Sequence, residues 1–172
     1  MSATKKLDGD LRRRLAQVRL LSLDVDGVQT DGGVYVDEAG QVTRRFHVHD
    51  GVGIQRVMRA GIEIVMISAG RSSSIEHRAD RLGVKYVFTA VQDKLVTLGN
   101  LAEDLEIPLE QVVHVGDDLN DLPLLQAVGC PMTVPNGMPE LKDAACYVTM
   151  RSGGDGAVRE ICDLLLTARD DG

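Results

Sequence analysis

The sequence contains no tryptophan, and aromatic residues make up only 3% of its 172 positions. Valine, leucine and isoleucine must therefore build the core, and the length is enough for one domain with a sizeable core. The cysteines Cys130, Cys146 and Cys162 are odd in number and form no C-x-x-C pair. This pattern argues against a disulfide framework or a zinc site, and it favours a reducing cytoplasm.

Basic residues are also fewer than acidic ones. The sequence has 19 lysines and arginines against 26 aspartates and glutamates, which gives a net charge of −7. That balance argues against nucleic-acid binding, since the phosphate backbone attracts basic proteins. No apolar run reaches membrane-spanning length. Residues 1–16 lack the apolar core of a signal peptide and predict a solvated lead-in with a short helix. An anionic substrate would need a local cation or metal to bind this chain.

Short apolar runs alternate with helical patterns along the rest of the chain, and two alternating runs around "DEAG" predict a β-hairpin over 33–48. We expect one α/β domain over 1–172, with a Rossmann-like, doubly wound, mostly parallel sheet and a Gly-rich tail and last helix over 151–172. The predicted strands are 18–25, 62–68, 84–88, 111–118, 131–134 and 146–149, and the predicted helices are 51–61, 72–83, 93–106, 120–128, 138–144 and 156–169.

Polar side chains follow four of these strands. Asp24 and Asp26 come at the end of the first strand, and Ser68 ends the second. Lys94 follows the third strand, and Asp117 ends the fourth. Ligands bind outside the carboxyl ends of the strands in such sheets. Carboxylates, a hydroxyl and an ammonium are therefore expected at one edge.

This set of groups suits phosphoryl transfer. Oxygen ligands from Asp24, Asp26 and Asp117 suit one Mg²⁺, which keeps several waters. Ser68 and Lys94 offer a hydroxyl and an ammonium to a phosphate dianion. Asp24 would attack phosphorus to give an aspartyl-phosphate, and Asp26, on the same side of an extended chain, would serve as acid and base.

Four segments in this order resemble the motifs of the haloacid dehalogenase superfamily, namely "DVDGVQT", Ser68, Lys94 and "GDDLND". Further stretches resemble the 3-deoxy-D-manno-octulosonate 8-phosphate phosphatase family over residues 18–166, among them "FHVHDGVGI", "EHRADRLGV" and "SGGDGAVREICDLLL". The resemblance implies Mg²⁺-dependent hydrolysis of a sugar-acid phosphate ester, a step towards the inner sugar of lipopolysaccharide.

The resemblance also implies roles for individual residues. Asp24 is implied as nucleophile and metal ligand, and Asp26 as the acid and base whose backbone carbonyl also binds the metal. Asp117 is implied as the third ligand, with Asp118 and Asp121 close behind it. The candidates for binding phosphate or the rest of the substrate are Ser68, Lys94, Thr30, Ala69, Arg71 and Arg78.

The motif spacing leaves no room for a cap domain. Only 43 residues lie between Asp24 and Ser68, and 25 lie between Ser68 and Lys94. An open site excludes water poorly, so a neighbouring subunit is expected to cover it. The resemblance implies a homotetramer in which hairpins assemble and a neighbour's tail reaches the site. The tail residues expected near that site are Arg151, Gly153, Gly154 and Arg159.

Departures from the family pattern leave the substrate open. Ala69 and Gly70 stand where the family has Gly and Arg, His49 replaces a frequent Arg, and Gln29 replaces a usual Leu. The eight-carbon sugar acid is the first expectation, and a nine-carbon (KDN or N-acylneuraminate) 9-phosphate is the alternative. A non-catalytic tetrameric assembly module is the alternative from another class.

Two histidine patterns have a structural interpretation. His47 and His49 fall on one face of the predicted hairpin strand and mimic a metal pair, but they lack a third ligand. A hairpin-surface or subunit contact is therefore preferred for them.

His114 lies in an apolar strand and is interpreted as a hydrogen-bonded core residue. Ser72 is expected to cap the helix that follows it.

Overall fold

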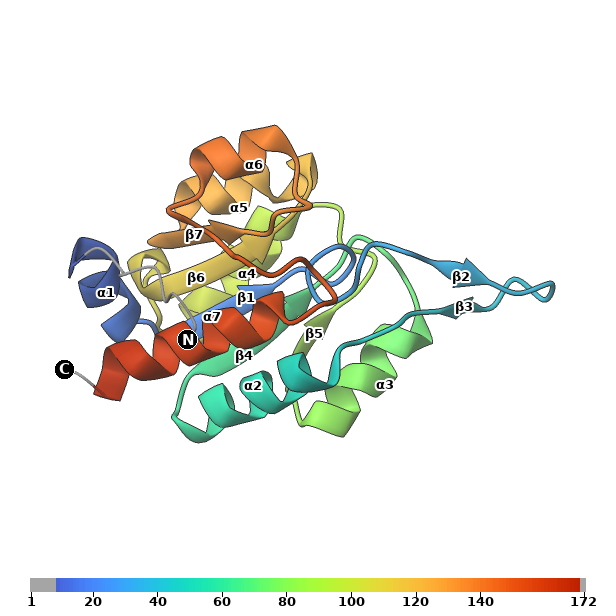
Figure 1. The fold of residues 1–172 in the computed structure, drawn as a ribbon, viewed down its shortest axis with the longest axis horizontal. Helices are drawn as coiled ribbons and strands as arrows, with labels where there is room; N and C mark the ends of the chain where they lie inside the picture. The colour runs from blue at the N-terminus through green and yellow to red at the C-terminus, as the bar shows by residue number, and fades with distance from the viewer. Residues whose placement is uncertain (1–8, 171–172) are drawn as a thin grey trace.

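The computed structural model describes residues 9–170. Its centre is a six-stranded sheet, and Figure 1 shows how the helices surround it. The strand order is β5-β4-β1-β6-β7-β8, and every neighbouring pair is parallel. The predicted parallel α/β architecture is therefore confirmed. The strands are β1 (Leu20–Leu23), β4 (Glu63–Ile67), β5 (Tyr86–Phe88), β6 (Val112–Gly116), β7 (Cys130–Thr133) and β8 (Tyr147–Val148).

Helices cover both faces of this sheet. One face packs against α1 (Gly9–Ala16), α2 (Val48–Arg59), α3 (Ser73–Leu82) and α7 (Ala157–Asp170). The other face packs against α4 (Lys94–Asp104) and α5 (Leu122–Ala127), with α6 (Pro139–Ala144) beside α5. Short 3₁₀ turns, η1 (Leu109–Gln111) and η2 (Leu119–Asp121), come before β6 and α5.

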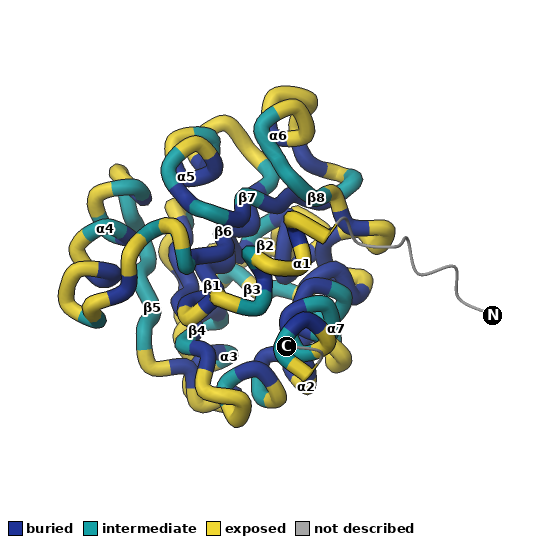
Figure 2. Tube along the Cα trace, turned by 90° about the vertical axis from the view of Figure 1, so that its left-hand side faces the viewer, coloured by how far each residue is buried: buried dark blue, intermediate teal, exposed yellow. Residues whose placement is uncertain are grey.

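The central strand β1 shows why the apolar runs are continuous. All four of its residues are buried, because both faces of the sheet are covered (Figure 2). Leu21 and Leu23 pack in the core under α2 and α7, whereas Leu20 packs in the core under α4. Asp24, which follows the carboxyl end of β1, therefore lies at the edge of the sheet between the helices that cover its two faces.

The hairpin consists of β2 (Tyr35–Val36) and β3 (Val42–Thr43), which pair antiparallel and project from the body (Figure 1). The paired strands are shorter than the predicted range 33–48, and α2 begins at Val48. His47 is the N-cap of α2, and its ring meets the ring of His49 edge to face, with 5.1 Å between centroids. The prediction that both histidines lie on one strand face is wrong.

No further domain is inserted within residues 9–170, so the prediction of a fold without a cap is confirmed. Residues 1–8 of the expected lead-in lie outside the described residues, and α1 accounts for the rest of it. Within the described part of the chain, no helix has both the length and the apolar character needed to cross a bilayer.

Candidate active site

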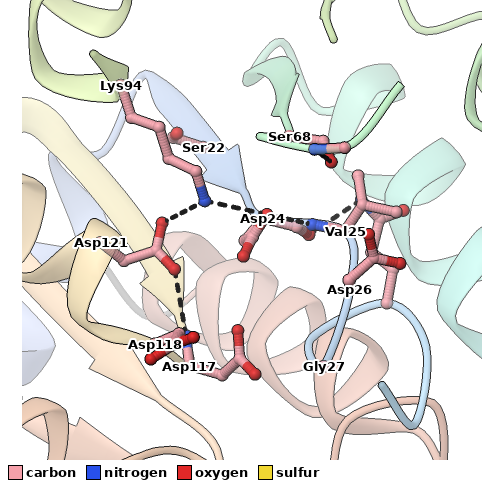
Figure 3. Close-up of polar contacts among 12 residues, drawn as sticks. Ser22, Asp24, Val25, Asp26, Gly27, Ser68, Lys94, Asp117, Asp118 and Asp121 are labelled. Atoms are coloured by element: carbon pink, nitrogen blue, oxygen red, sulfur yellow. Dashed lines mark hydrogen bonds and ion pairs between the residues drawn. The ribbon is translucent and has the colours of Figure 1, made fainter. Parts of the chain in front are cut away.

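Lys94 joins two of the carboxylates at the carboxyl edge of the sheet (Figure 3). Its Nζ lies 3.0 Å from Oδ1 of Asp24 and donates a 2.6 Å hydrogen bond to Oδ1 of Asp121. The lysine side chain is only 2% exposed. It is the first residue of α4, and the Asp93 side chain caps that helix by accepting from Val96 N. The capped start of α4 therefore places the Lys94 side chain beside the carboxylates.

A buried hydrogen-bond chain holds Asp121 in place. His114 Nε2 lies 3.2 Å from Asp121 Oδ1, and His114 Nδ1 lies 2.9 Å from Ser22 Oγ. Burial lowers the pKa of His114, so the neutral ring donates to Asp121 and accepts from Ser22. His114 is therefore a hydrogen-bonded core residue, as the sequence predicted. One of its two partners, Asp121, belongs to the carboxylate cluster of the site.

Three carboxylates form a cluster that suits a divalent cation. Oxygens of Asp24, Asp117 and Asp121 all lie within 4.8 Å of one another. Gly27, with a φ of +84°, leaves room for this cluster, since a Cβ there would overlap Oδ2 of Asp117. Carboxylate oxygens at this spacing are the ligands that Mg²⁺ prefers. Asp118 is exposed and caps η2 through Leu119 N, so it stands outside the cluster.

The charges in this cluster oppose one another. Burial and the charge of Asp121 raise the pKa of Asp24 well above its ordinary value, against the pull of Lys94. Burial and the charge of Asp121 also raise the pKa of Asp117 to about 6. Burial would raise the pKa of Asp121, but the His114 hydrogen bond and the Lys94 charge lower it. A cation would relieve this repulsion and favour the ionised forms of Asp24 and Asp117.

Asp26 faces a different partner. Its carboxylate lies apart from the Asp24–Lys94 pair (Figure 3) and accepts two hydrogen bonds from Arg44, at 2.6 Å and 3.1 Å. The predicted contribution of Asp26 to metal binding is through its backbone carbonyl, and that contribution stays a prediction. The sequence indicated no role for Arg44, because nothing in the local pattern of the hairpin shows where its base meets the sheet.

The loop after β4 places Ser68 beside the site. Ser68 is buried, and its Oγ accepts from Gly70 N at 3.1 Å, which makes a tight turn. Ala69 and Arg71 are exposed on this loop. Ser72 accepts from Ser74 N and caps α3, so the predicted cap is confirmed. The binding roles of Ser68, Ala69 and Arg71 stay predictions.

Thr30 and Gln29 shape the loop that follows Asp24. The Thr30 hydroxyl is buried and accepts from the backbone N–H groups of Gly27 and Gly32, both at 3.2 Å. Gln29 Nε2 donates to the backbone carbonyl of Asp24 at 3.1 Å. Both side chains therefore fix the backbone around Asp24, and the binding role of Thr30 stays a prediction.

The Gly-rich tail packs on this same loop. Gly154 N donates to Val28 O at 3.2 Å, and Asn136 links Gly153 N to Gly27 O with two bonds of 2.8 Å. Gly153 and Gly154 are buried within the chain, and their position near a neighbouring subunit's site stays a prediction. Close backbone contact, which only glycine allows, explains their presence here.

Arg78 and the two tail arginines, Arg151 and Arg159, have partners within the chain. Arg78 donates to the backbone carbonyl of His47 at 3.0 Å and lies over the Phe46 ring, 5.2 Å from its centroid. Arg151 donates to Asp155 O, and Arg159 bonds the Asp163 carboxylate at 2.8 Å. The contact of Arg151 and Arg159 with a neighbouring subunit stays a prediction.

The tail contact leads to a stability prediction. Gly153→Ala is expected to lower the free energy of unfolding by about 2 kcal/mol or more, because its Cβ would overlap Gly27 O and force backbone to move. Urea denaturation followed by circular dichroism measures this. Gly99→Ala in α4 is the matched control, since no atom lies within 4 Å of its added Cβ. Equal stability of the two variants would contradict the contact.

The four sequence motifs meet at the carboxyl edge of the sheet. They are represented there by Asp24, Ser68, Lys94 and the carboxylates after β6. Fold and site define a haloacid dehalogenase-like hydrolase, and the family model of that description matches residues 86–161. The 3-deoxy-D-manno-octulosonate 8-phosphate phosphatase of Yersinia pestis is 41% identical over 161 residues, which cover 94% of this chain and 86% of that protein. The chain belongs to the 3-deoxy-D-manno-octulosonate 8-phosphate phosphatase family, a family of phosphoric monoester hydrolases.

Other relatives agree over nearly the whole chain. The Escherichia coli phosphatase of the same name is 39% identical over 163 residues, covering 95% of this chain and 87% of that protein. The Moraxella catarrhalis phosphatase was solved in complex with a magnesium ion, a phosphate ion and KDO. That structure matches with a TM-score of 0.93 and 33% identity, covering 96% of this chain and 95% of that one.

Proposed function

We propose that this protein is an Mg²⁺-dependent phosphatase that hydrolyses 3-deoxy-D-manno-octulosonate 8-phosphate through an aspartyl-phosphate on Asp24. The observation that carries the proposal is the buried Asp24, bound by Lys94 and gathered with Asp117 and Asp121 within 4.8 Å. The choice of substrate rests on the relatives, because those of Yersinia pestis and Escherichia coli are named 3-deoxy-D-manno-octulosonate 8-phosphate phosphatases.

The chain's own groups supply each step of the hydrolysis. Val25 N and Lys94 Nζ both contact Oδ1 of Asp24, which fixes the carboxylate for attack on phosphorus. As the Asp24–phosphorus bond forms, the phosphorus–sugar bond breaks and Asp26 gives a proton to the sugar oxygen. Asp26 then takes a proton from water, which displaces Asp24 and releases phosphate. Asp24, Asp117 and the Asp26 carbonyl would hold Mg²⁺, which screens negative charge during the attack.

A non-catalytic assembly module explains this site less well. Burying Lys94 between Asp24 and Asp121 costs desolvation, and such pairs are weak evidence for a stabilising role. A scaffold also has no need for a third carboxylate beside them. The cluster is therefore better explained by a ligand that compensates its charge.

Phosphate release from a panel of sugar phosphates in the presence of Mg²⁺ tests the proposal. We expect the highest kcat/KM with 3-deoxy-D-manno-octulosonate 8-phosphate. A higher value with a nine-carbon 9-phosphate would reassign the substrate and keep the chemistry. No phosphate release from any ester would refute the enzyme itself.

We also propose that the protein is a cytoplasmic homotetramer assembled through its hairpins. The hairpin exposes Val34, Tyr35 and Val36, which is apolar surface that a partner would cover. The cytoplasm is in keeping with the three free thiols of Cys130, Cys146 and Cys162.

A charge on the hairpin is expected to disrupt the tetramer. Val36→Glu should shift sedimentation towards smaller species, because burying an unpaired carboxylate in an interface is costly. Val96→Glu on α4 is the control, since Val96 is similarly exposed and lies away from the hairpin. Unchanged sedimentation of Val36→Glu would argue against assembly through the hairpin.

A further inference from the structure

Arg44 links three elements around the proposed acid and base. It follows β3 at the base of the hairpin, and its Nε and Nη2 donate to Oδ1 and Oδ2 of Asp26. Its Nη1 donates to Ser74 Oγ at 3.2 Å, in the first turn of α3. One guanidinium thus ties the loop after β1 to the helix after β4.

This pair differs from an ordinary surface ion pair. The Arg44 side chain is only 4% exposed, and it binds both carboxylate oxygens in a fork, a geometry that restricts orientation. The adjacent Arg45 provides the contrast, because it is 54% exposed and meets Asp31 through one contact of 3.4 Å. Exposed pairs of that kind contribute little.

The Arg44–Asp26 pair also lies beside the expected phosphate position. A Cβ added to Gly70 would lie 3.2 Å from Arg44 Nη2, 3.2 Å from Asp26 Oδ2 and 3.5 Å from Ser68 Oγ. The absence of a side chain at Gly70 therefore leaves room for the pair. Within residues 9–170, Arg44 is the only side chain whose hydrogen bonds to the Asp26 carboxylate the structure records.

We propose that Arg44 is a positioning residue that holds the Asp26 carboxylate beside Ser68, where Asp26 meets the leaving sugar oxygen. The inference rests on the proposed function, because it takes Asp26 as the acid and base. The fork uses one lone pair on each carboxylate oxygen and leaves the others for proton exchange with the substrate. Arg44 acts through Asp26 and takes no covalent part in the reaction.

Leaving-group dependence separates this role from a general effect on the fold. A sugar alkoxide needs a proton as it leaves, whereas p-nitrophenolate leaves without one. Arg44→Met is expected to lower the first-turnover rate of sugar release from the sugar-acid phosphate at least about tenfold, a part of what acid–base catalysis contributes. On p-nitrophenyl phosphate, we expect the first-turnover release of p-nitrophenolate to fall less than about threefold in the same preparation, because this release needs no proton from Asp26. Later turnovers of both esters share the hydrolysis of the aspartyl-phosphate, in which Asp26 takes a proton from water. Arg44→Lys, which keeps one cation but no fork, should recover part of the loss.

Arg45→Met is the matched control and should leave both activities unchanged. In an Asp26→Asn background, Arg44→Met should cause no further loss on the sugar ester, because residues that act as a unit are not additive. Equal losses in the first turnover of both esters, or a further loss in that background, would overturn the positioning role. Unchanged turnover of both esters by Arg44→Met would also overturn it and leave the proposed function standing. A parent chain inactive on both esters would refute the proposed function itself.

Discussion

Asp24→Asn is expected to lower turnover of the sugar-acid phosphate by at least about a thousandfold, because the covalent route is lost. The fold should survive. An amide oxygen can still accept from Val25 N and Lys94 Nζ, the two groups that contact Oδ1 of Asp24. The substitution also removes a negative charge that lies near Asp121. Rapid-quench phosphate release and urea denaturation measure the two effects.

Ser73→Ala is a suitable control for this variant, since Ser73 is exposed on α3 and the structure gives its side chain no role in the site. It should keep full activity and the stability of the parent. If Asp24→Asn retained turnover within about tenfold of the parent, Asp24 would not be the nucleophile.

Removal of divalent cations by EDTA is expected to stop turnover completely, and Mg²⁺ should restore it. Ca²⁺ should be a poor substitute, because it prefers more ligands at longer distances. Asp117→Asn should weaken the restoration by Mg²⁺. Asp118→Asn should not, since Asp118 is exposed and caps η2. Full activity in the presence of the chelator would refute the metal site.

The same cluster gives the metal effect a pH dependence. The pKa of Asp117 is raised from 3.8 to about 6, so the unfolded chain loses this proton before the folded chain does. Without metal, the contribution of Asp117 to stability therefore falls as pH rises from about 4 to 6. Mg²⁺ binds the ionised carboxylates, so its stabilisation should grow over the same range. Thermal unfolding by circular dichroism at pH 5, 6 and 7, with and without Mg²⁺, measures this; a shift independent of pH would contradict it.

Sequence patterns predicted the polar residues of the site that directly follow a strand. Asp24, Ser68 and Asp117 each follow a buried apolar run, and parallel pairing brings such ends to one edge whatever the loops do. Lys94 was found because it follows the third predicted strand at the start of a helix, and α4 does begin at Lys94. These residues depend on local structure and on one rule of sheet topology.

The residues that the sequence did not predict depend on contacts across the fold. Arg44 reaches Asp26 only because the base of the hairpin passes beside the loop after β1. Asn136 joins Gly27 to Gly153 across 109 and 17 positions of the chain. Helix α2 begins at Val48, whereas the sequence predicted a helix from residue 51. Near this start, the buried Asp50 accepts a hydrogen bond from Arg159 N of α7, a contact that the local sequence does not reveal. No periodicity encodes such pairings.

The packing of Gly153 and Gly154 on the loop after β1 has a consequence for biosynthesis. The aspartate proposed as nucleophile leaves the ribosome early, but its loop gains its last backbone contacts only when the Gly-rich segment has emerged. Such long-range closures form late, since distant segments must meet first. A nascent or truncated chain that ends before Gly153 would carry all four motifs and still lack the support for Asp24. We therefore expect the loop after β1 to reach its final packing only after residues 153 and 154 have been synthesised.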